Sequence, residues 1–383
     1  MIKELTVNQF TIFKKAKFQF GKSLNVLIGE NGAGKTQVLK LLYAMTVLFP
    51  QYQKEGHSYF GHVLGAKELE TFKAIFKVGM IAELVNMEHR NKKTKVLGME
   101  KVRTEQGEDV DVMNVDVVDV ASNNTVSFEK DGASYEYDVE LKFRDVVATN
   151  MRNAKGLRSI PAGLIPESLF LPTREMLTIY PNYQSLSKKY HLPYDQTYDD
   201  TIVALGLPYQ KEITAEYDGI VEELEKAIDG EIILRNEKFY FHPNSAPQDQ
   251  DFDINMTAEG WRKLGMVLQL LKNGGLHTGM ALFWDEPEAN LNPQLIRLIA
   301  KVIVQLSRQG IQVFLTTHSL FLLREVDMLT KAGKSVFDKG DVRFFNFIGK
   351  GKVEQGNTPE ELGDILLLDE SMAQSDRFMK MEE

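Results

Sequence analysis

The stretch that decides the fold is Gly29-Glu30-Asn31-Gly32-Ala33-Gly34-Lys35-Thr36, which fits the phosphate-binding pattern G-x-x-x-x-G-K-[ST] at every defined position. The apolar run 24–28 before it predicts a buried strand, and apolar residues at helical spacing over 38–48 predict a helix after it. The glycines therefore lie in a strand-to-helix turn, where backbone N–H groups and the helix N-terminus face an anionic phosphate. In this arrangement Lys35 would reach the β- and γ-phosphates, and the Thr36 hydroxyl would bind Mg²⁺.

The composition is that of an ordinary globular protein, with 383 residues, 43% of them hydrophobic and 26% charged. At roughly 150 residues per domain, this length allows two or three lobes. The net charge of -9 argues against a chain that coats nucleic acid through bulk charge, but it leaves room for a local basic groove. The absence of cysteine excludes a disulfide framework and a cysteine-ligated metal site. Without a signal peptide or an apolar run of about 18 residues, we expect a cytosolic chain that does not itself insert into a membrane.

A second apolar run, 280–284, ends abruptly in Asp285-Glu286-Pro287. In nucleotide hydrolases such a strand lies beside the phosphate loop, so Asp285 is expected to hold Mg²⁺. Glu286 is then expected to polarise the attacking water as the general base.

A third apolar run, 313–317, ends in His318 and follows the acid pair by one predicted helix, Pro293 to Arg308. A right-handed β-α-β crossover would bring His318 next to the same phosphates. Its predicted role is to sense and hold the γ-phosphate.

The N-terminal residues alternate like two paired strands, 5–10 and 16–20, joined by residues 11–15. Phe13, Lys14 or Lys15 could flank an adenine, or they belong to a solvated hairpin tip. Residues 51–61 are polar and predict a loop.

Short strand-like runs with one wet face follow over residues 76–144. Their basic cluster, 89–95, is either a solvated turn or a contact with nucleic-acid phosphates. The buried strand 168–171 then runs into Pro172-Thr173-Arg174-Glu175, which makes Arg174 and Glu175 either further site candidates or a structural ion pair.

These motifs together resemble an ABC-type ATPase. The phosphate loop matches Walker A, 282–287 matches Walker B, Ala289-Asn290-Leu291-Asn292-Pro293 matches the D-loop, and His318 matches the switch histidine. More narrowly, residues 10–34 and 172–175 resemble the SMC/RecF/OLD branch of AAA-type ATPases. This resemblance implies a head-to-head dimer with two trapped ATP molecules, each between the phosphate loop of one chain and the signature motif of the other.

The matching signature segment contains Thr257, Ala258, Glu259 and Gly260, followed by an apolar helix. Ala258 stands where the family has serine; Thr257 is a candidate for the missing hydroxyl, and Gly260 permits close approach of the backbone. By the resemblance, these residues and Asn290 contact nucleotide. The usual Q-loop glutamine is also missing, and Arg174 or Glu175 is the candidate for its place.

The predicted fold class is α/β: a P-loop NTPase built as an ABC-type ATPase head, with an N-terminal antiparallel β subdomain and a mixed α+β insertion between Walker A and the signature motif. We divide the chain into an N-terminal ATPase lobe (1–75), a mixed strand and helix insertion with a helical region (76–250), a C-terminal ATPase lobe (251–350) and a short strand with an acidic helical tail (351–383). The insertion holds no long coiled coil, and residues 332–383 leave no room for a Toprim nuclease.

The resemblance implies hydrolysis of ATP to ADP and phosphate, with Mg²⁺. Our first hypothesis is the sensor or regulatory subunit of a two-component prokaryotic anti-phage defence or DNA-maintenance complex, as in the PARIS and Septu types. Such a subunit controls a separate effector protein, often a nuclease, through ATP-dependent oligomerisation. The alternative is a RecF-like DNA repair ATPase that binds DNA directly. The nucleotide-binding subunit of a transporter is disfavoured by the missing standard signature and glutamine and by the large insertion.

Overall fold

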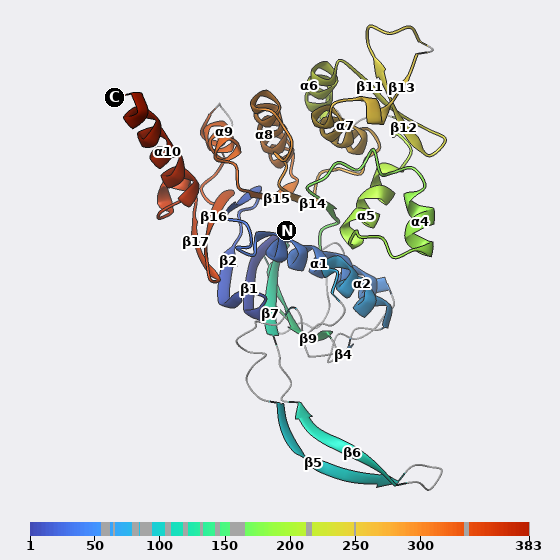
Figure 1. Cartoon of the computed structure of the whole chain (residues 1–383), viewed down its shortest axis with the longest axis vertical. Coiled ribbons are helices and arrows are strands. Elements are labelled where there is room, and N and C mark those ends of the chain that lie inside the picture. Colours follow the sequence, from blue (N-terminus) through green and yellow to red (C-terminus); the bar gives the residue numbers. More distant parts are fainter. Residues whose placement is uncertain are drawn as a thin grey trace.

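A six-stranded sheet in the order β10-β14-β15-β3-β16-β17 lies at the centre of the computed structural model (Figure 1). Five strands are parallel, and the edge strand β17 is antiparallel. The bounds are β10 (Ser168–Leu171), β14 (Ala281–Asp285), β15 (Gln312–Thr317), β3 (Leu24–Gly29), β16 (Val342–Gly349) and β17 (Lys352–Gly356). The first four of these strands confirm the predicted apolar runs. The structure describes residues 1–54, 62–63, 66–78, 84, 94–103, 109–117, 122–130, 133–141, 146–153, 165–211, 217–248, 250–332 and 337–382.

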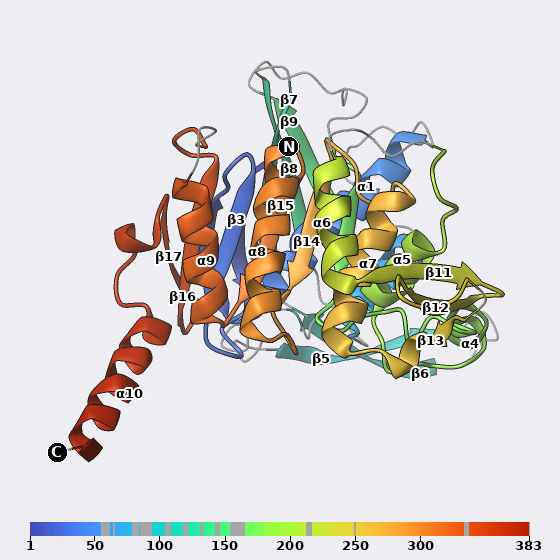
Figure 2. The same ribbon diagram turned by 90° about the horizontal axis from the view of Figure 1, so that it is seen from above.

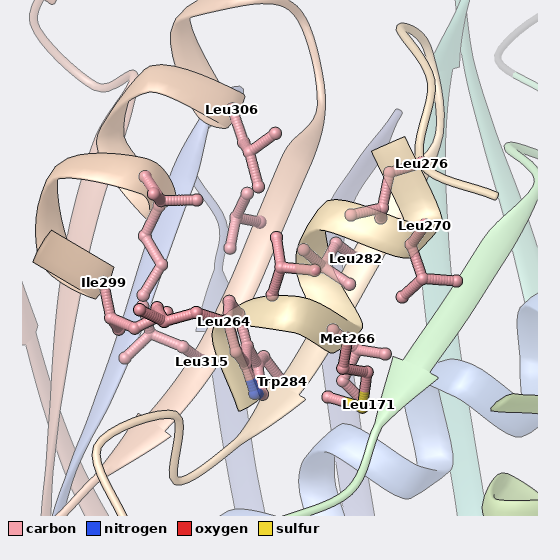
Figure 3. Close-up of a cluster of buried hydrophobic side chains, with 14 of the residues drawn as sticks. Leu171, Leu264, Met266, Leu270, Leu276, Leu282, Trp284, Ile299, Leu306 and Leu315 are labelled. Carbon is pink, nitrogen blue, oxygen red and sulfur yellow. The ribbon is translucent and has the colours of Figure 1, made fainter. Parts of the chain in front are cut away.

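The two faces of this sheet bury two separate cores, because successive side chains of a strand point to opposite faces. In β14, Leu282 and Trp284 join the core under the helices α6, α7, α8 and α9, while Ala281 and Phe283 join the core that contains α1 (Figures 2 and 3). The helices are α1 (Lys35–Lys54), α6 (Asp218–Ile228), α7 (Glu259–Lys272), α8 (Pro293–Arg308) and α9 (Leu320–Lys331). Burial on both faces explains why these strands read as continuous apolar runs.

An antiparallel sheet, β2-β1-β7-β8-β9-β4, packs against the α1 side. Its strands are β1 (Ile2–Phe10), β2 (Phe13–Gln19), β4 (His62–Val63), β7 (Ser122–Lys130), β8 (Ala133–Leu141) and β9 (Val146–Asn153). The N-terminal hairpin is confirmed, but its turn is only Thr11 and Ile12, since Phe10 pairs with Phe13. The predicted connection through residue 15 was therefore too long.

The insertion completes this N-terminal sheet, because β1 pairs with β7. The helix α2 (Ala66–Phe76) adds Phe72 and Ile75 to the same core, and β5 (Thr94–Arg103) pairs with β6 (Asp109–Val117) as a hairpin. The predicted borders 75/76 and 350/351 cut across the β1–β7 sheet and the β16–β17 hairpin, and the four-part division stays a prediction.

Two sequence-based expectations fall partly or wholly beyond what the structure describes. Of the predicted loop 51–61, residues 51–54 belong to α1, so that part of the prediction was wrong, and 55–61 lie outside the described residues. In the basic cluster, 89–93 also lie outside them.

The remaining elements surround the edges of the central sheet. They are α4 (Tyr183–Lys189), α5 (Gln196–Leu205), β11 (Gly230–Arg235), β12 (Lys238–Pro243), β13 (Phe252–Asp253) and the 3-10 turns η3 (Ile254–Met256) and η4 (Pro359–Glu361). The final helix, α10 (Leu366–Glu382), extends away from the body (Figures 1 and 2). Its Met372, Phe378, Met379 and Met381 side chains are exposed.

Candidate functional site

The phosphate loop joins β3 to α1 as predicted, and its glycines are sterically required. Gly32 and Gly34 have φ of +77° and +89°, a region that favours glycine. A Cβ on Gly34 would also lie 2.8 Å from the ring of Phe13. Glu30, Asn31 and Gly32 are exposed at the outer arch of the loop, and Ala33 is buried beneath it.

Lys35 is buried and turns back on its own loop, where Nζ donates to the carbonyl oxygens of Gly29 (2.6 Å) and Glu30 (2.7 Å). Burial lowers the pKa of Lys35, and the neighbouring carboxylates of Glu286 and Asp285 oppose that shift. The ammonium is therefore held at the phosphate loop by groups that an anionic ligand can replace.

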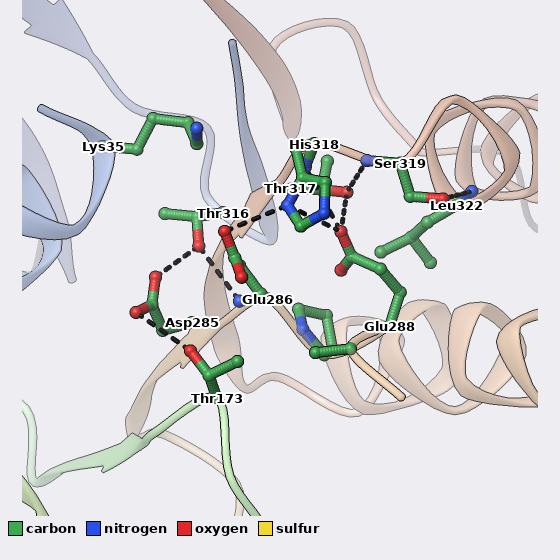
Figure 4. Close-up of polar contacts among 12 residues, drawn as sticks. Lys35, Thr173, Asp285, Glu286, Glu288, Thr316, Thr317, His318, Ser319 and Leu322 are labelled. Atoms are coloured by element: carbon green, nitrogen blue, oxygen red, sulfur yellow. Dashed lines mark hydrogen bonds and ion pairs between the residues drawn. The ribbon is translucent and has the colours of Figure 1, made fainter. Parts of the chain in front are cut away.

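Asp285, at the end of β14, accepts hydrogen bonds from three threonine hydroxyls. Figure 4 shows the contacts with Thr173 and Thr316. Its Oδ1 accepts from Thr36 (2.9 Å) and Thr316 (2.6 Å), and its Oδ2 accepts from Thr173 (3.3 Å). The predicted pair of Thr36 and Asp285 is thus brought together. Thr173 and Thr316 were not predicted as site residues, because a threonine at a strand end carries no specific sequence signal.

The Walker B strand β14 lies beside the phosphate loop as expected, although it is not a direct neighbour of the phosphate-loop strand β3. β15 lies between β14 and β3. Asp285 nevertheless reaches Thr36, because the parallel strands end at the same edge of the sheet. The intervening strand supplies Thr316, whose hydroxyl donates to Asp285 and accepts the N–H of Glu286 (3.0 Å).

Glu286, His318 and Glu288 form a second chain of contacts (Figure 4). Glu286 Oε1 lies 3.0 Å from His318 Nδ1. Glu288 Oε1 accepts from the Thr317 hydroxyl (2.6 Å) and from the backbone N–H of His318 (3.2 Å). Burial raises the pKa of Glu288. The crossover brings His318 to Glu286, and its predicted contact with the γ-phosphate stays a prediction. Sequence reasoning missed Glu288, because a third acid at this point resembles ordinary surface charge.

The signature segment lies at the N-terminus of α7. Ala258 is its N-cap and provides no side-chain cap, and the Thr257 hydroxyl donates back to the Ile254 carbonyl oxygen (2.7 Å). Glu259 Oε1 accepts from Asn290 Nδ2 (2.8 Å), which joins this helix end to the D-loop. Gly260 is buried, and a Cβ there would lie 2.5 Å from Leu295. The close approach allowed by Gly260 is therefore to α8 of the same chain.

Two basic side chains of α7, Lys263 and Arg262, contact the loops that follow β14 and β10. Lys263 is 1% exposed, and its Nζ donates to the carbonyl oxygens of Glu286 (3.4 Å), Pro287 (3.2 Å) and Ala289 (3.0 Å). Burial lowers its pKa to about 8. Arg262 Nε lies 3.0 Å from Oε1 of the buried Glu175. We call Glu175, Arg262 and Lys263 the α7 anchor.

The α7 anchor includes Glu175 but not Arg174. Glu175 is in the ion pair and also accepts from the Leu177 N–H (2.9 Å) and the Thr178 hydroxyl (2.7 Å), so it is structural. Arg174 is exposed, and its candidacy for the missing glutamine stays a prediction. From this loop the structure brings Thr173 to Asp285 instead.

The predicted adenine contact of Phe13 is wrong. Phe13 is fully buried, and its ring packs edge-on against Phe18 and Phe347. Its apolar side chain belongs to the core that supports the phosphate loop. Lys14 and Lys15 are exposed, and their predicted contact remains a hypothesis.

The donor set fits Mg²⁺ with a nucleotide. Thr36 and Asp285 offer hard oxygen ligands within hydrogen-bond distance of each other, and Mg²⁺ usually takes one or two carboxylates and completes its shell with phosphates and water. Among the described residues, no three His, Cys, Asp or Glu side chains cluster as a metal site. The Thr36 and Asp285 oxygens leave most of an octahedral shell to phosphate and water.

Residues 118–324 match the family described as "AAA domain, putative AbiEii toxin, Type IV TA system". The match spans more than half of the 383 residues. The chain belongs to this AAA family. Together with the fold, this membership confirms the resemblance to ABC-type AAA ATPases of the SMC/RecF branch.

The fold is similar to that of SMC heads. An SMC head bound to the C-winged helix domain of ScpA aligns over 94% of this chain and 98% of its own, with a TM-score of 0.50 and 13% identity. The Thermotoga maritima SMC head domain aligns over 93% and 98% (TM-score 0.45, 12% identity). A head domain with an extended coiled coil, bound to the C-terminal domain of ScpA derived from Pyrococcus furiosus, aligns over 99% of both chains (TM-score 0.46, 12% identity). At these identities the likeness concerns the fold alone.

Within the part of the chain that the structure describes, none of the helices is both long and apolar enough to cross a lipid bilayer.

Proposed function

We propose that this chain binds ATP with Mg²⁺ and hydrolyses it to ADP and phosphate. The observation that carries the proposal is the meeting of Lys35, Thr36, Asp285, Glu286 and His318 at the carboxyl ends of three neighbouring strands. The AAA family match supports ATP as the substrate. ATPases with this loop use Mg²⁺ to neutralise the phosphates.

In the proposed mechanism, Thr36 and Asp285 hold the cation, which would neutralise charge on the phosphate oxygens. Lys35 exchanges the carbonyl oxygens of Gly29 and Glu30 for phosphate oxygens. Glu286 accepts a proton from the attacking water as general base. The His318 ring orients that carboxylate through Nδ1, and its side chain, 45% exposed, can contact the γ-phosphate through its second nitrogen.

A second copy of the chain would complete the site. In this proposal, residues 257–260 of one copy offer the N-terminus of α7 to the γ-phosphate of the other, and Asn290 lies at the same interface. Exposed Met256 and Trp261 flank that helix end and support an interface there. We propose the head-to-head dimer as the ATP-bound form.

We further propose that ATP turnover regulates a separate effector protein in a defence or DNA-maintenance complex. The family description names a toxin–antitoxin system, which has two components, and this supports the proposal of a separate second protein. The exposed apolar side chains of α10 offer a surface for a partner. A RecF-like role on DNA is the alternative outcome of the experiments below.

The first test is ATP hydrolysis and nucleotide binding by the purified chain. Wild type should release phosphate only with Mg²⁺, and Lys35→Ala should lose nucleotide binding. Lys40→Ala is the matched control, because Lys40 lies on the same helix but pairs with Asp195 (2.6 Å). Equal ATP affinity of wild type and Lys35→Ala would contradict the proposed site.

The second test concerns the partner. Tagged Glu286→Gln and Lys35→Ala chains are recovered from native cells with Mg²⁺ and ATP, and bound proteins and nucleic acid are identified. A soluble protein retained by only one variant would support ATP-gated control of an effector. DNA without protein would favour the repair role, and a membrane protein would favour a transporter.

A further inference from the structure

The place of Thr173 next to Asp285 follows from the sheet. β10 pairs in parallel with β14, with Leu171 opposite Trp284, so the residues that follow each strand emerge side by side at the carboxyl edge. The Thr173 hydroxyl donates to Asp285 Oδ2, on the carboxylate oxygen opposite the one that Thr36 and Thr316 contact.

The three threonine hydroxyls around Asp285 differ in whether their oxygen also accepts a hydrogen bond. Thr316 accepts the Glu286 N–H, so its oxygen is already used to position the backbone. For Thr36 and Thr173, the hydrogen bonds within the described part of the chain are donations to Asp285. Their oxygen lone pairs therefore remain open to a cation.

The loop that carries Thr173 is held in place. Glu175, two residues on, is 6% exposed and is bound by the Leu177 N–H, the Thr178 hydroxyl and Arg262. A ligand on a loop tied down by buried polar contacts keeps its geometry when the cation enters.

We propose that Thr173 is a cation ligand of this site, supplying a third protein oxygen beside those of Thr36 and Asp285. The inference rests on the proposed Mg²⁺-ATP function and adds a residue to it. Three hard oxygens from separate elements suit a small divalent cation that also binds phosphate.

The test uses the absence of cysteine from the chain, because Thr173→Cys introduces a single thiol. Thiolate is a soft ligand that prefers Cd²⁺ to Mg²⁺. We expect Thr173→Cys to bind ATP weakly with Mg²⁺ and to recover affinity with Cd²⁺, with a thiolate-to-cadmium absorption band in the ultraviolet. The matched control is Thr178→Cys, since Thr178 is on the same loop but contacts Glu175.

Two conservative variants give the size of the effect. Thr173→Val should need about tenfold more Mg²⁺ for half-maximal ATP binding, by analogy with the loss of a supporting group at other metal sites. Thr173→Ser keeps the hydroxyl and should behave as wild type. Thermal unfolding without nucleotide should agree among wild type, Thr173→Val and Thr173→Ser.

The outcomes separate the two proposals. Absence of both the cadmium band and the Cd²⁺ rescue in Thr173→Cys, with Mg²⁺-dependent ATP binding intact in wild type, would overturn Thr173 as a ligand and leave the ATPase proposal standing. If the affinity of the wild type for ATP did not depend on divalent cations, both the Thr173 proposal and the Mg²⁺-ATP proposal would be overturned.

Discussion

Two polar clusters meet at the backbone of Glu286, and they are built in opposite ways. In the more exposed cluster, the Glu286 and His318 side chains are 25% and 45% exposed and contact each other. In the α7 anchor, Lys263 is 1% exposed and donates to three backbone carbonyl oxygens. The more exposed cluster leaves side chains accessible to a ligand. In the buried cluster, Lys263 is hydrogen-bonded to backbone carbonyl oxygens and Arg262 is paired with Glu175.

This difference in burial lets the site keep accessible side chains on loops whose backbone is held in place. Buried charges must be paired or hydrogen-bonded, so each anchor residue fixes a partner in place. Lys263 fixes the backbone that follows Glu286, and Arg262 fixes the loop that carries Thr173. Removing an exposed group should therefore change chemistry, and removing a buried one should change stability.

The largest expected effect is on turnover, from Glu286→Gln. Loss of a general base typically lowers the rate about 10²- to 10⁴-fold. ATP affinity should persist, because Lys35 and Thr36 are unchanged. Phosphate release and equilibrium nucleotide binding measure the two quantities. Full turnover by this variant would remove Glu286 from the role of base.

The next effect is on stability, from Arg262→Met. The buried Glu175 carboxylate would lose its cation, which costs about 3–5 kcal/mol in the free energy of unfolding. Adding Glu175→Gln should restore part of this loss, since the uncompensated charge is removed. Denaturant unfolding of both variants checks the prediction, and a loss below about 1 kcal/mol for Arg262→Met would show that the pair is not buried as described.

A smaller effect depends on pH through Lys263. Its folded pKa, about 8, is below the ordinary value of 10.5, so above pH 8 the unfolded chain binds more protons than the folded one at this group. The stability of the wild type relative to Lys263→Met should therefore rise with pH above 8, by up to about 1.4 kcal/mol per pH unit. Unfolding of both proteins from pH 7 to 9.5 measures this difference. A flat or falling difference would contradict the buried, charged lysine.

The smallest effect is expected from Asn290→Ala. This change removes the hydrogen bond to Glu259, but Asn290 is exposed and water can replace the lost partner. Asn290 also has a φ of +62°, a left-handed conformation that alanine adopts less readily, so the free energy of unfolding should fall by about 1 kcal/mol. Thermal unfolding without nucleotide tests this, and a larger loss would move Asn290 into the structural group with the α7 anchor.

Local patterns in the sequence were sufficient for the phosphate loop and the strands that end in Asp285 and His318. Each of these elements is encoded in a contiguous run of residues. The apolar residues predict a buried strand, and the glycines or polar residues at its end predict the loop that follows. The predicted helix Pro293–Arg308 has the same origin, since Asn292 caps it by accepting from the Leu295 N–H (3.0 Å) and proline begins it.

Only the tertiary structure decided which residues meet. The position of β15 between β14 and β3, the contact of Thr173 with Asp285, and the burial of Phe13 depend on sheet order and strand register, which join residues more than a hundred positions apart. Lys263 likewise appears in the sequence as one basic residue of an amphipathic helix. Its role follows from the backbone carbonyl groups that the folded D-loop presents to it, and no local pattern encodes that contact.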